Sequence, residues 1–216
     1  MKKVDPNLAT IYLVRHGQSE HNVQQRMAGH VDTPLTPQGE REAKQLAQKL
    51  KHIHFDEAFS SDLVRAKRTA EIIALERKLA VKTTEKIREK SFGSYEGKLY
   101  KEFNDTFAHL FKAHDRLTDK QRFNSKLAND IETDDHAVTR LITFLREIAI
   151  AYPKKTILVV AHGSIMRYFL IRVGFSTYQT TSPDSISNLG YIKLESDGVD
   201  FFIKETQGIK FGEPKK

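Results

Sequence analysis

Two stretches of the chain, Thr10-Ile11-Tyr12-Leu13-Val14-Arg15-His16-Gly17 and Thr156-Ile157-Leu158-Val159-Val160-Ala161-His162-Gly163, decide the expected fold. Each is a short apolar run, too brief for a helix, that ends in a histidine followed by glycine. The second run is apolar throughout, which is typical of a strand covered on both faces of a parallel sheet. We therefore expect two buried strands, 11–15 and 157–161, whose histidines lie at the carboxyl edge of one sheet, where α/β proteins form their sites.

The rest of the chain alternates between strand and helix patterns. Helix start signals occur at Thr36-Pro37, at Asp62 as an expected N-cap, and at Thr133. Further strands are expected at 55–61, 81–84, 192–195 and 199–203, the last two forming a hairpin around Asp197-Gly198. This alternation predicts an α/β fold: a three-layer α/β/α sandwich with a mainly parallel sheet.

Residues from about 98 to 135 interrupt the alternation, because they carry a helical pattern without any strand. Phe103, Phe107 and Phe111 repeat at helical spacing among charged residues, which favours core packing over an aromatic nucleotide platform. We expect a helical insertion or lid here, with His109 and His114 exposed to solvent. The whole chain, 1–216, is expected to form a single domain.

Composition excludes several classes of protein. The 216 residues include no cysteine, which excludes disulfide scaffolds, zinc ribbons and cysteine-nucleophile enzymes. The net charge of +7 favours anionic ligands, but basic residues are mixed with acidic ones, so no nucleic-acid partner is expected. No apolar run is long enough to span a membrane and none follows Met1 as a signal core, so a soluble, cytoplasmic protein is expected.

Several further blocks make the first histidine motif more specific. In chain order they are Leu13–Ser19, Asn22, Asp32–Thr36 with Gly39, Ser60–Ala66 with Thr69-Ala70, Arg88-Glu89 ahead of Phe92–Gly97, and Val160–Gly163. Together these blocks resemble the histidine phosphatase superfamily, which includes the cofactor-dependent phosphoglycerate mutases. The resemblance spans nearly the whole chain except the insertion, and it implies a phosphoglycerate mutase-like fold.

The resemblance also implies a role for each site residue. His16 would attack phosphorus and carry a phosphohistidine intermediate, and Glu89 would donate and accept protons. A catalytic cage would surround the transferred phosphoryl group with donors from Arg15, Arg65 and His162, and the phosphate contacts would extend to Asn22 and Gly163. No metal ion and no other cofactor is expected, since His52 and His54 lack a third ligand at recognisable spacing.

Three activities are compatible with these residues. The favoured one is a metal-independent phosphatase that hydrolyses a small phosphomonoester, because residues 98–135 lack the proline and the paired arginines of the longer mutases of this family. A cofactor-dependent phosphoglycerate mutase is the alternative. A non-catalytic phosphate- or phosphopeptide-binding module is disfavoured, because binding alone requires neither a nucleophile nor an acid. The expected partner is a small phosphorylated metabolite, and a homodimer is left open.

Overall fold

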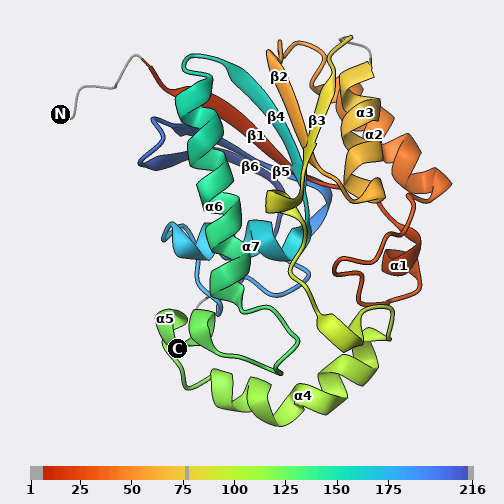
Figure 1. Cartoon of the computed structure of the whole chain (residues 1–216), viewed down its shortest axis with the longest axis vertical. Helices are drawn as coiled ribbons and strands as arrows, with labels where there is room; N and C mark the ends of the chain where they lie inside the picture. Colours follow the sequence, from red (N-terminus) through yellow and green to blue (C-terminus); the bar gives the residue numbers. More distant parts are fainter. Residues whose placement is uncertain (1–6, 76–77, 214–216) are drawn as a thin grey trace.

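The computed structural model describes residues 7–75 and 78–213. Its centre is a six-stranded sheet with the strand order β3-β2-β4-β1-β5-β6 (Figure 1). The strands are β1 (Ala9–Arg15), β2 (Glu57–Ser61), β3 (Val81–Thr84), β4 (Thr156–Ala161), β5 (Ile186–Ser196) and β6 (Phe201–Ile209). Neighbours from β3 to β1 pair in parallel, whereas β5 and β6 pair antiparallel. The expected α/β class with a mainly parallel sheet is confirmed.

Helices connect the strands and begin mostly where the sequence predicts. They are α1 (Glu20–Val23), α2 (Pro37–Lys49), α3 (Val64–Leu75), α4 (Tyr100–His114), α5 (Asp119–Asn124), α6 (Asp134–Ala151) and α7 (Gly163–Arg172). Thr36 caps α2 by accepting a hydrogen bond from the Gly39 N–H, and Thr133 caps α6 by accepting one from the His136 N–H. Both hydroxyls satisfy backbone donors that the first helical turn leaves without a partner.

Two local expectations are wrong. Asp62 does not cap α3: its carboxylate pairs with Arg88, and Asp32 Oδ1 accepts the hydrogen bond of the Val64 N–H at 2.9 Å. The C-terminal hairpin is longer than expected, because β5 begins at Ile186 and pairs with both β1 and β6. Residues 187–190 are mostly polar or glycine, so the sequence shows no strand pattern where β5 begins. In each case a partner that is distant in sequence decides the local structure.

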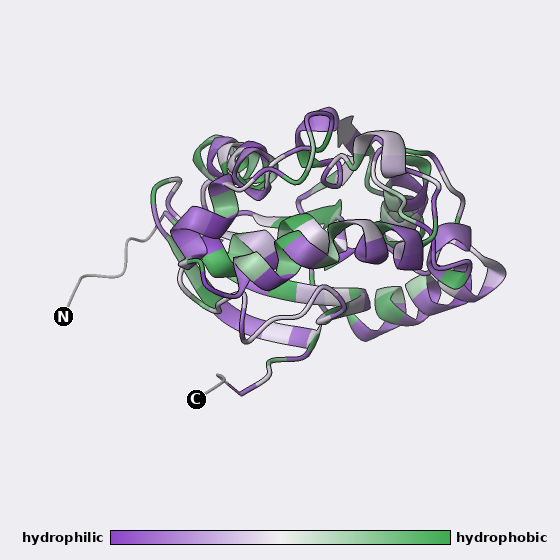
Figure 2. Ribbon diagram, turned by 90° about the horizontal axis from the view of Figure 1, so that it is seen from below, coloured by the Kyte–Doolittle hydropathy of each residue, from purple (hydrophilic) through white to green (hydrophobic). Residues whose placement is uncertain are grey.

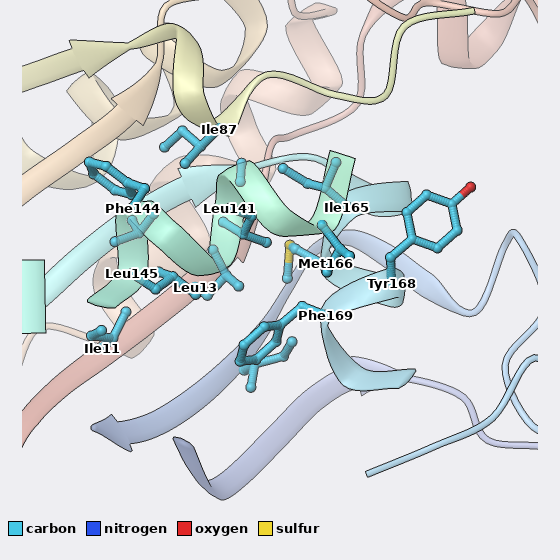
Figure 3. Close-up of a cluster of buried hydrophobic side chains, with 14 of the residues drawn as sticks. Ile11, Leu13, Ile87, Leu141, Phe144, Leu145, Ile165, Met166, Tyr168 and Phe169 are labelled. Carbon is cyan, nitrogen blue, oxygen red and sulfur yellow. The ribbon is translucent and has the colours of Figure 1, made fainter. Parts of the chain in front are cut away.

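Side chains of the central strands alternate between two faces, and each face packs against its own pair of helices. Ile11 and Leu13 belong to a buried cluster with α6 and α7, part of which is drawn in Figure 3. Tyr12 and Val14 belong to a second cluster with α2 and α3. Burying one aliphatic side chain of this kind stabilises the fold by roughly 2 kcal/mol. The expected α/β/α layering follows, and in Figure 2 hydrophobic residues gather on the strands between more polar helices.

The strand order creates a crevice at the site of the two histidines. The chain leaves β1 toward α2 on one face of the sheet and leaves β4 toward α7 on the other. Because β1 and β4 are parallel neighbours, their carboxyl ends lie side by side where the two connections diverge. Ligands of open α/β sheets bind at such switch points.

The segment expected as an insertion contains α4 and α5, at the lower end of the molecule in Figure 1. Its aromatic stripe packs as expected, because Phe103 and Phe107 form a separate buried cluster with Met27 and Ile131. The backbone also joins this segment to the loop after α1: the Met27 N–H donates to Lys98 O at 2.8 Å. Movement of this segment as a lid stays a prediction. Across 7–75 and 78–213, every helix is too short or too polar to cross a bilayer.

Candidate active site

The sheet brings His16 and His162 together. Arg15 of β1 lies opposite Ala161 of β4, so the residue that follows each strand is a histidine at the same sheet edge. The His16 N–H donates to Ala161 O at 3.0 Å, and the two imidazole centroids lie 5.2 Å apart. The juxtaposition expected from the sequence is thus present, and strand register is its cause.

The His16 ring is held in one tautomer. Its Nδ1 lies 2.7 Å from Gly17 O, and because a carbonyl can only accept, Nδ1 carries the proton. The other ring nitrogen, Nε2, then has a free lone pair. Burial, reinforced by the charges of Arg65 and Arg15, holds the pKa of His16 well below its usual value. A neutral imidazole with an available Nε2 lines the cavity described below.

Two guanidinium groups lie beside His16. Arg65, from the first turn of α3, is fully buried and donates to Val31 O at 2.9 Å and to Gly29 O at 2.8 Å. Arg15, at the end of β1, donates through Nη1 to Ile186 O. Burial lowers the pKa of Arg65 to about 10, so it stays charged at neutral pH. Backbone carbonyls therefore fix both guanidiniums without neutralising them.

His162 lies behind His16 and is fully buried. It does not line the cavity, unlike the other residues expected in the cage. Neither of its ring nitrogens has a hydrogen-bond partner among the residues that the structure describes. Burial, then the charge of Arg65, holds its pKa well below the usual value. His162 is therefore a neutral ring whose polar atoms are free to bond within the site.

Both histidines are followed by glycine for steric reasons. A Cβ at position 17 would lie 2.8 Å from Gly39 O, so a side chain there would push the β1–α1 loop away from α2. A Cβ at position 163 would lie 3.1 Å from Arg15 Nε, inside normal packing distance. The repeated His-Gly pair thus allows close packing at the switch point.

Glu89 follows β3 and the short turn Glu85–Ile87, and reaches the N-terminus of α7. Its carboxylate accepts backbone hydrogen bonds from Lys90, Ser164 and Ile165, at 2.8, 3.0 and 3.2 Å. Glu89 is 9% exposed, so it is not a surface carboxylate, although it lies in a charged run of the sequence. An acidic group at a helix N-terminus is favoured by the free N–H groups and the helix dipole.

Asn22 is oriented by its neighbours. Its Oδ1 accepts hydrogen bonds from the Ser19 N–H at 3.0 Å and from Asn188 Nδ2 at 3.2 Å. With the oxygen engaged, the amide NH₂ is the group left to donate. Asn188, which also donates to His16 O, lies on β5, and no motif in the sequence points to it.

A cavity of about 370 Å³ opens in front of these side chains, and Arg15, His16, Asn22, Arg65, Glu89 and Gly163 all line it. This volume suits a small metabolite. The cavity also has lining residues that the sequence did not single out as site residues, including Lys90, Arg122, Asp134 and Arg167.

The expected exposure of His114 is wrong. This histidine is 8% exposed, lines the cavity and lies 2.6 Å from Ser125 Oγ through Nε2. The segment expected as an insertion therefore contributes polar side chains to the cavity wall.

Within 7–75 and 78–213, no group of three His, Asp or Glu side chains is arranged to hold a metal ion. His52 and His54, considered as ligands from the sequence, are both exposed.

The model of the histidine phosphatase superfamily (branch 1) matches residues 11–207 of the chain. An uncharacterized phosphatase of Bacillus subtilis, PhoE, is 31% identical over 77% of this chain and 78% of its own length. A broad-specificity phosphatase of Saccharomyces cerevisiae is 29% identical over 97% of this chain and 91% of its own. Other relatives are named phosphoglycerate mutases or mutase-like proteins. The solved structure of Bacillus stearothermophilus YhfR superposes with a TM-score of 0.76 at 25% identity, covering 90% of this chain and 95% of YhfR.

The chain belongs to the histidine phosphatase superfamily. Its fold is phosphoglycerate mutase-like, as the resemblance implies. The chain is therefore an enzyme of the histidine-phosphatase type. Its relatives are named as phosphatases and as phosphoglycerate mutases.

Proposed function

We propose that the chain is a metal-independent phosphatase that hydrolyses a small phosphomonoester through a phosphohistidine on His16. The observation that carries the proposal is the neutral His16 ring, tethered through Nδ1 to Gly17 O, between two charged guanidiniums on a cavity wall. An uncharged imidazole nitrogen is a nucleophile for phosphorus at neutral pH.

In the first step, His16 Nε2 attacks phosphorus, the N–P bond forms and the ester P–O bond breaks. Arg15 and Arg65 stabilise the negative charge on the phosphoryl oxygens, because a guanidinium can donate two parallel hydrogen bonds to such a group. The Asn22 amide supplies a further donor from the cavity wall. We assign another to His162, which lies beside His16 just outside the lining and whose ring nitrogens have no partner among the described residues. Because these groups are fixed before the substrate arrives, little reorganisation is needed in the transition state.

In the second step, water attacks the phosphohistidine, the N–P bond breaks and inorganic phosphate leaves. We assign the proton transfers to Glu89, which lines the same cavity as His16. Glu89 relays a proton from the singly protonated phosphoryl group to the departing alkoxide in the first step, and from the attacking water to the released phosphate in the second. The protein then returns to its starting state.

His16→Ala should abolish turnover, because it removes the nucleophile of the proposed reaction. Brief reaction of the wild type with a ³²P-labelled phosphomonoester should leave acid-labile label on His16, and the rate should not change in excess chelator. His54→Ala, which removes an exposed histidine, is the matched control and should behave as wild type. Full turnover by His16→Ala, or chelator inhibition reversed by one divalent metal, would overturn the proposal.

A single pair of assays separates hydrolysis from phosphoryl rearrangement. We expect release of inorganic phosphate from small phosphomonoesters, with little interconversion of 2- and 3-phosphoglycerate when the protein is primed with bisphosphoglycerate. Efficient interconversion with little phosphate release would instead establish a mutase. Saturable phosphate binding with neither activity would establish a binding module.

A further inference from the structure

The cavity has a second group of charged and aromatic side chains that the proposed reaction does not use. We call it the α5/α7 cluster. Its members Lys90, Arg122, Asp134 and Arg167 line the cavity, and its fifth member, Tyr178, contacts three of them from outside the lining. Arg122 comes from α5 and Arg167 from the second turn of α7, so the helices bring together residues that are 45 positions apart in the sequence.

One ion pair in the cluster is complete. Lys90 Nζ lies 2.5 Å from Asp134 Oδ1, and the two side chains are 5% and 13% exposed. The other carboxylate oxygen of Asp134 accepts the hydroxyl hydrogen bond of Tyr178 at 2.7 Å. Asp134 therefore has both oxygens engaged, and its charge is balanced by Lys90.

The two arginines of the cluster have no such balance. Across 7–75 and 78–213, neither Arg122 nor Arg167 has a carboxylate within ion-pair distance. Arg167 is 5% exposed and donates through Nε to Thr181 O at 2.7 Å. Their guanidinium carbons lie 4.3 and 5.0 Å from the centroid of the same Tyr178 ring. Burying the Arg167 guanidinium without an anion is costly, and the half-buried Arg122 lies against the same ring, so a ligand anion that reaches both guanidiniums is favoured.

The electrostatics of neighbouring groups agree with this geometry. Burial lowers the pKa of Arg167; the nearby Asp134 carboxylate partly offsets this effect and the charge of Arg122 adds to it. Burial and the charge of Arg122 also lower the pKa of His114. Arg122 and Arg167 are therefore two like charges that line the same cavity. Five cationic side chains and the carboxylates of Glu89, Asp134 and Asp184 line the cavity. The proposed phosphoryl group engages Arg15 and Arg65, and Asp134 pairs with Lys90, whereas Arg122 and Arg167 form no ion pair with any of the three carboxylates.

We infer that Arg122 and Arg167 form a second anion subsite, so that the preferred substrates are phosphomonoesters carrying another carboxylate or phosphate group. This inference rests on the proposed function and deepens it by naming the substrate class. A guanidinium fork binds either anion in a bidentate manner, and the cavity volume of about 370 Å³ accommodates both ends of a small metabolite.

The test compares substrates that differ in the second anion alone. For the carboxylate, kcat/KM is measured for 3-phosphoglycerate against glycerol 3-phosphate; for the phosphate, fructose 1,6-bisphosphate is compared with fructose 6-phosphate. The wild type should prefer the doubly anionic member of at least one pair by roughly tenfold or more, beyond the factor of two that a second scissile group gives. The pair that shows the preference identifies the anion.

Arg122→Gln should reduce that preference about tenfold, because it removes one charged fork from a half-buried position that can be changed without opening the core. Arg116→Gln is the matched control: it removes the same charge from an exposed residue of the same segment, outside the cavity. Arg167→Lys keeps the charge of the buried residue and should lower the preference by weakening the bidentate contact. Equal kcat/KM ratios in wild type and Arg122→Gln, or an equal loss in Arg116→Gln, would overturn the subsite.

Calorimetric titration of the same four compounds into His16→Ala protein separates this inference from the proposed reaction. Tighter binding of the doubly anionic member, lost in the His16→Ala, Arg122→Gln double variant, would support the subsite even if no compound were hydrolysed. Equal affinities within both pairs, alongside normal hydrolysis, would exclude the subsite while leaving the phosphatase proposal intact.

Discussion

At the scale of single residues, the site depends on how closely backbone and side chains approach at the ends of β1 and β4. Gly163 is the first residue of α7, and the Arg15 guanidinium packs directly against its Cα. Arg15 keeps its position because its Nη1 is bonded to Ile186 O of β5. A methyl group at position 163 therefore meets a guanidinium with little freedom to move.

Gly163→Ala should lower kcat/KM for a phosphomonoester by roughly tenfold, because the added Cβ displaces Arg15 by a few tenths of an ångström. The melting temperature should change little, because the better helix propensity of alanine offsets the cost of displacing Arg15. Gly212→Ala is the control, because its new Cβ has no neighbour nearer than 3.8 Å. Unchanged kinetics in Gly163→Ala would show that the catalytic placement of Arg15 does not depend on a glycine at position 163.

At the scale of elements, helix α6 supports the loop that presents Glu89. Arg140 of α6 donates to Arg88 O at 2.6 Å and to Glu89 O at 2.7 Å, and its Nε lies 2.9 Å from Glu132 Oε1. Burial opposes ionisation of Glu132, but the hydrogen bond and charge of Arg140 lower its pKa to about 2. One buried ion pair therefore fixes two consecutive carbonyls of the loop, and with them the place of the Glu89 carboxylate.

Arg140→Gln should destabilise the protein by about 2 kcal/mol, because Glu132 loses its arginine partner and keeps only Ser91 and His136, and the carbonyls of Arg88 and Glu89 each lose a donor. It should also lower kcat, since the Glu89 backbone is no longer held. The comparison variant is Glu147→Gln, which breaks the exposed pair of Lys86 and Glu147 on the same helix and should cost less than about 1 kcal/mol. Urea unfolding and steady-state kinetics measure both effects; equal stability losses in the two variants would contradict the role of Arg140.

At the scale of the whole molecule, folding buries a pair of neutral histidines under positive charge. The pKa of His16 and that of His162 are each lowered by burial, whereas in the unfolded chain each titrates near 6.5. Below that pH the unfolded chain takes up protons that the folded protein does not, so the free energy of unfolding falls as the pH falls. Burial of these two histidines therefore lowers the stability of the folded protein in mild acid.

The unfolding free energy should decrease between pH 6.5 and 5.5 with a slope of about 1 kcal/mol per pH unit for each of the two histidines. His162→Gln should lower the slope by about 1 kcal/mol per pH unit and leave the contributions of His16, His21 and His114, whose pKa values are also lowered by burial. An exposed histidine substituted in the same way, His52→Gln, should leave the wild-type slope in place. Urea titrations at half-unit pH intervals measure this, and a flat profile in the wild type would contradict the burial of neutral rings.

The sequence by itself determined the layers, the strands that end in histidine and most helix starts, because side-chain periodicity and caps such as Thr36 act over a few residues. It also placed His16, Arg65 and Glu89 in recognisable blocks. Only the tertiary structure decided the cap of α3, the burial of His114 and the pairing of Arg122 with Arg167 around one tyrosine. Each of these joins segments far apart in the chain, and such contacts depend on packing that no local pattern records.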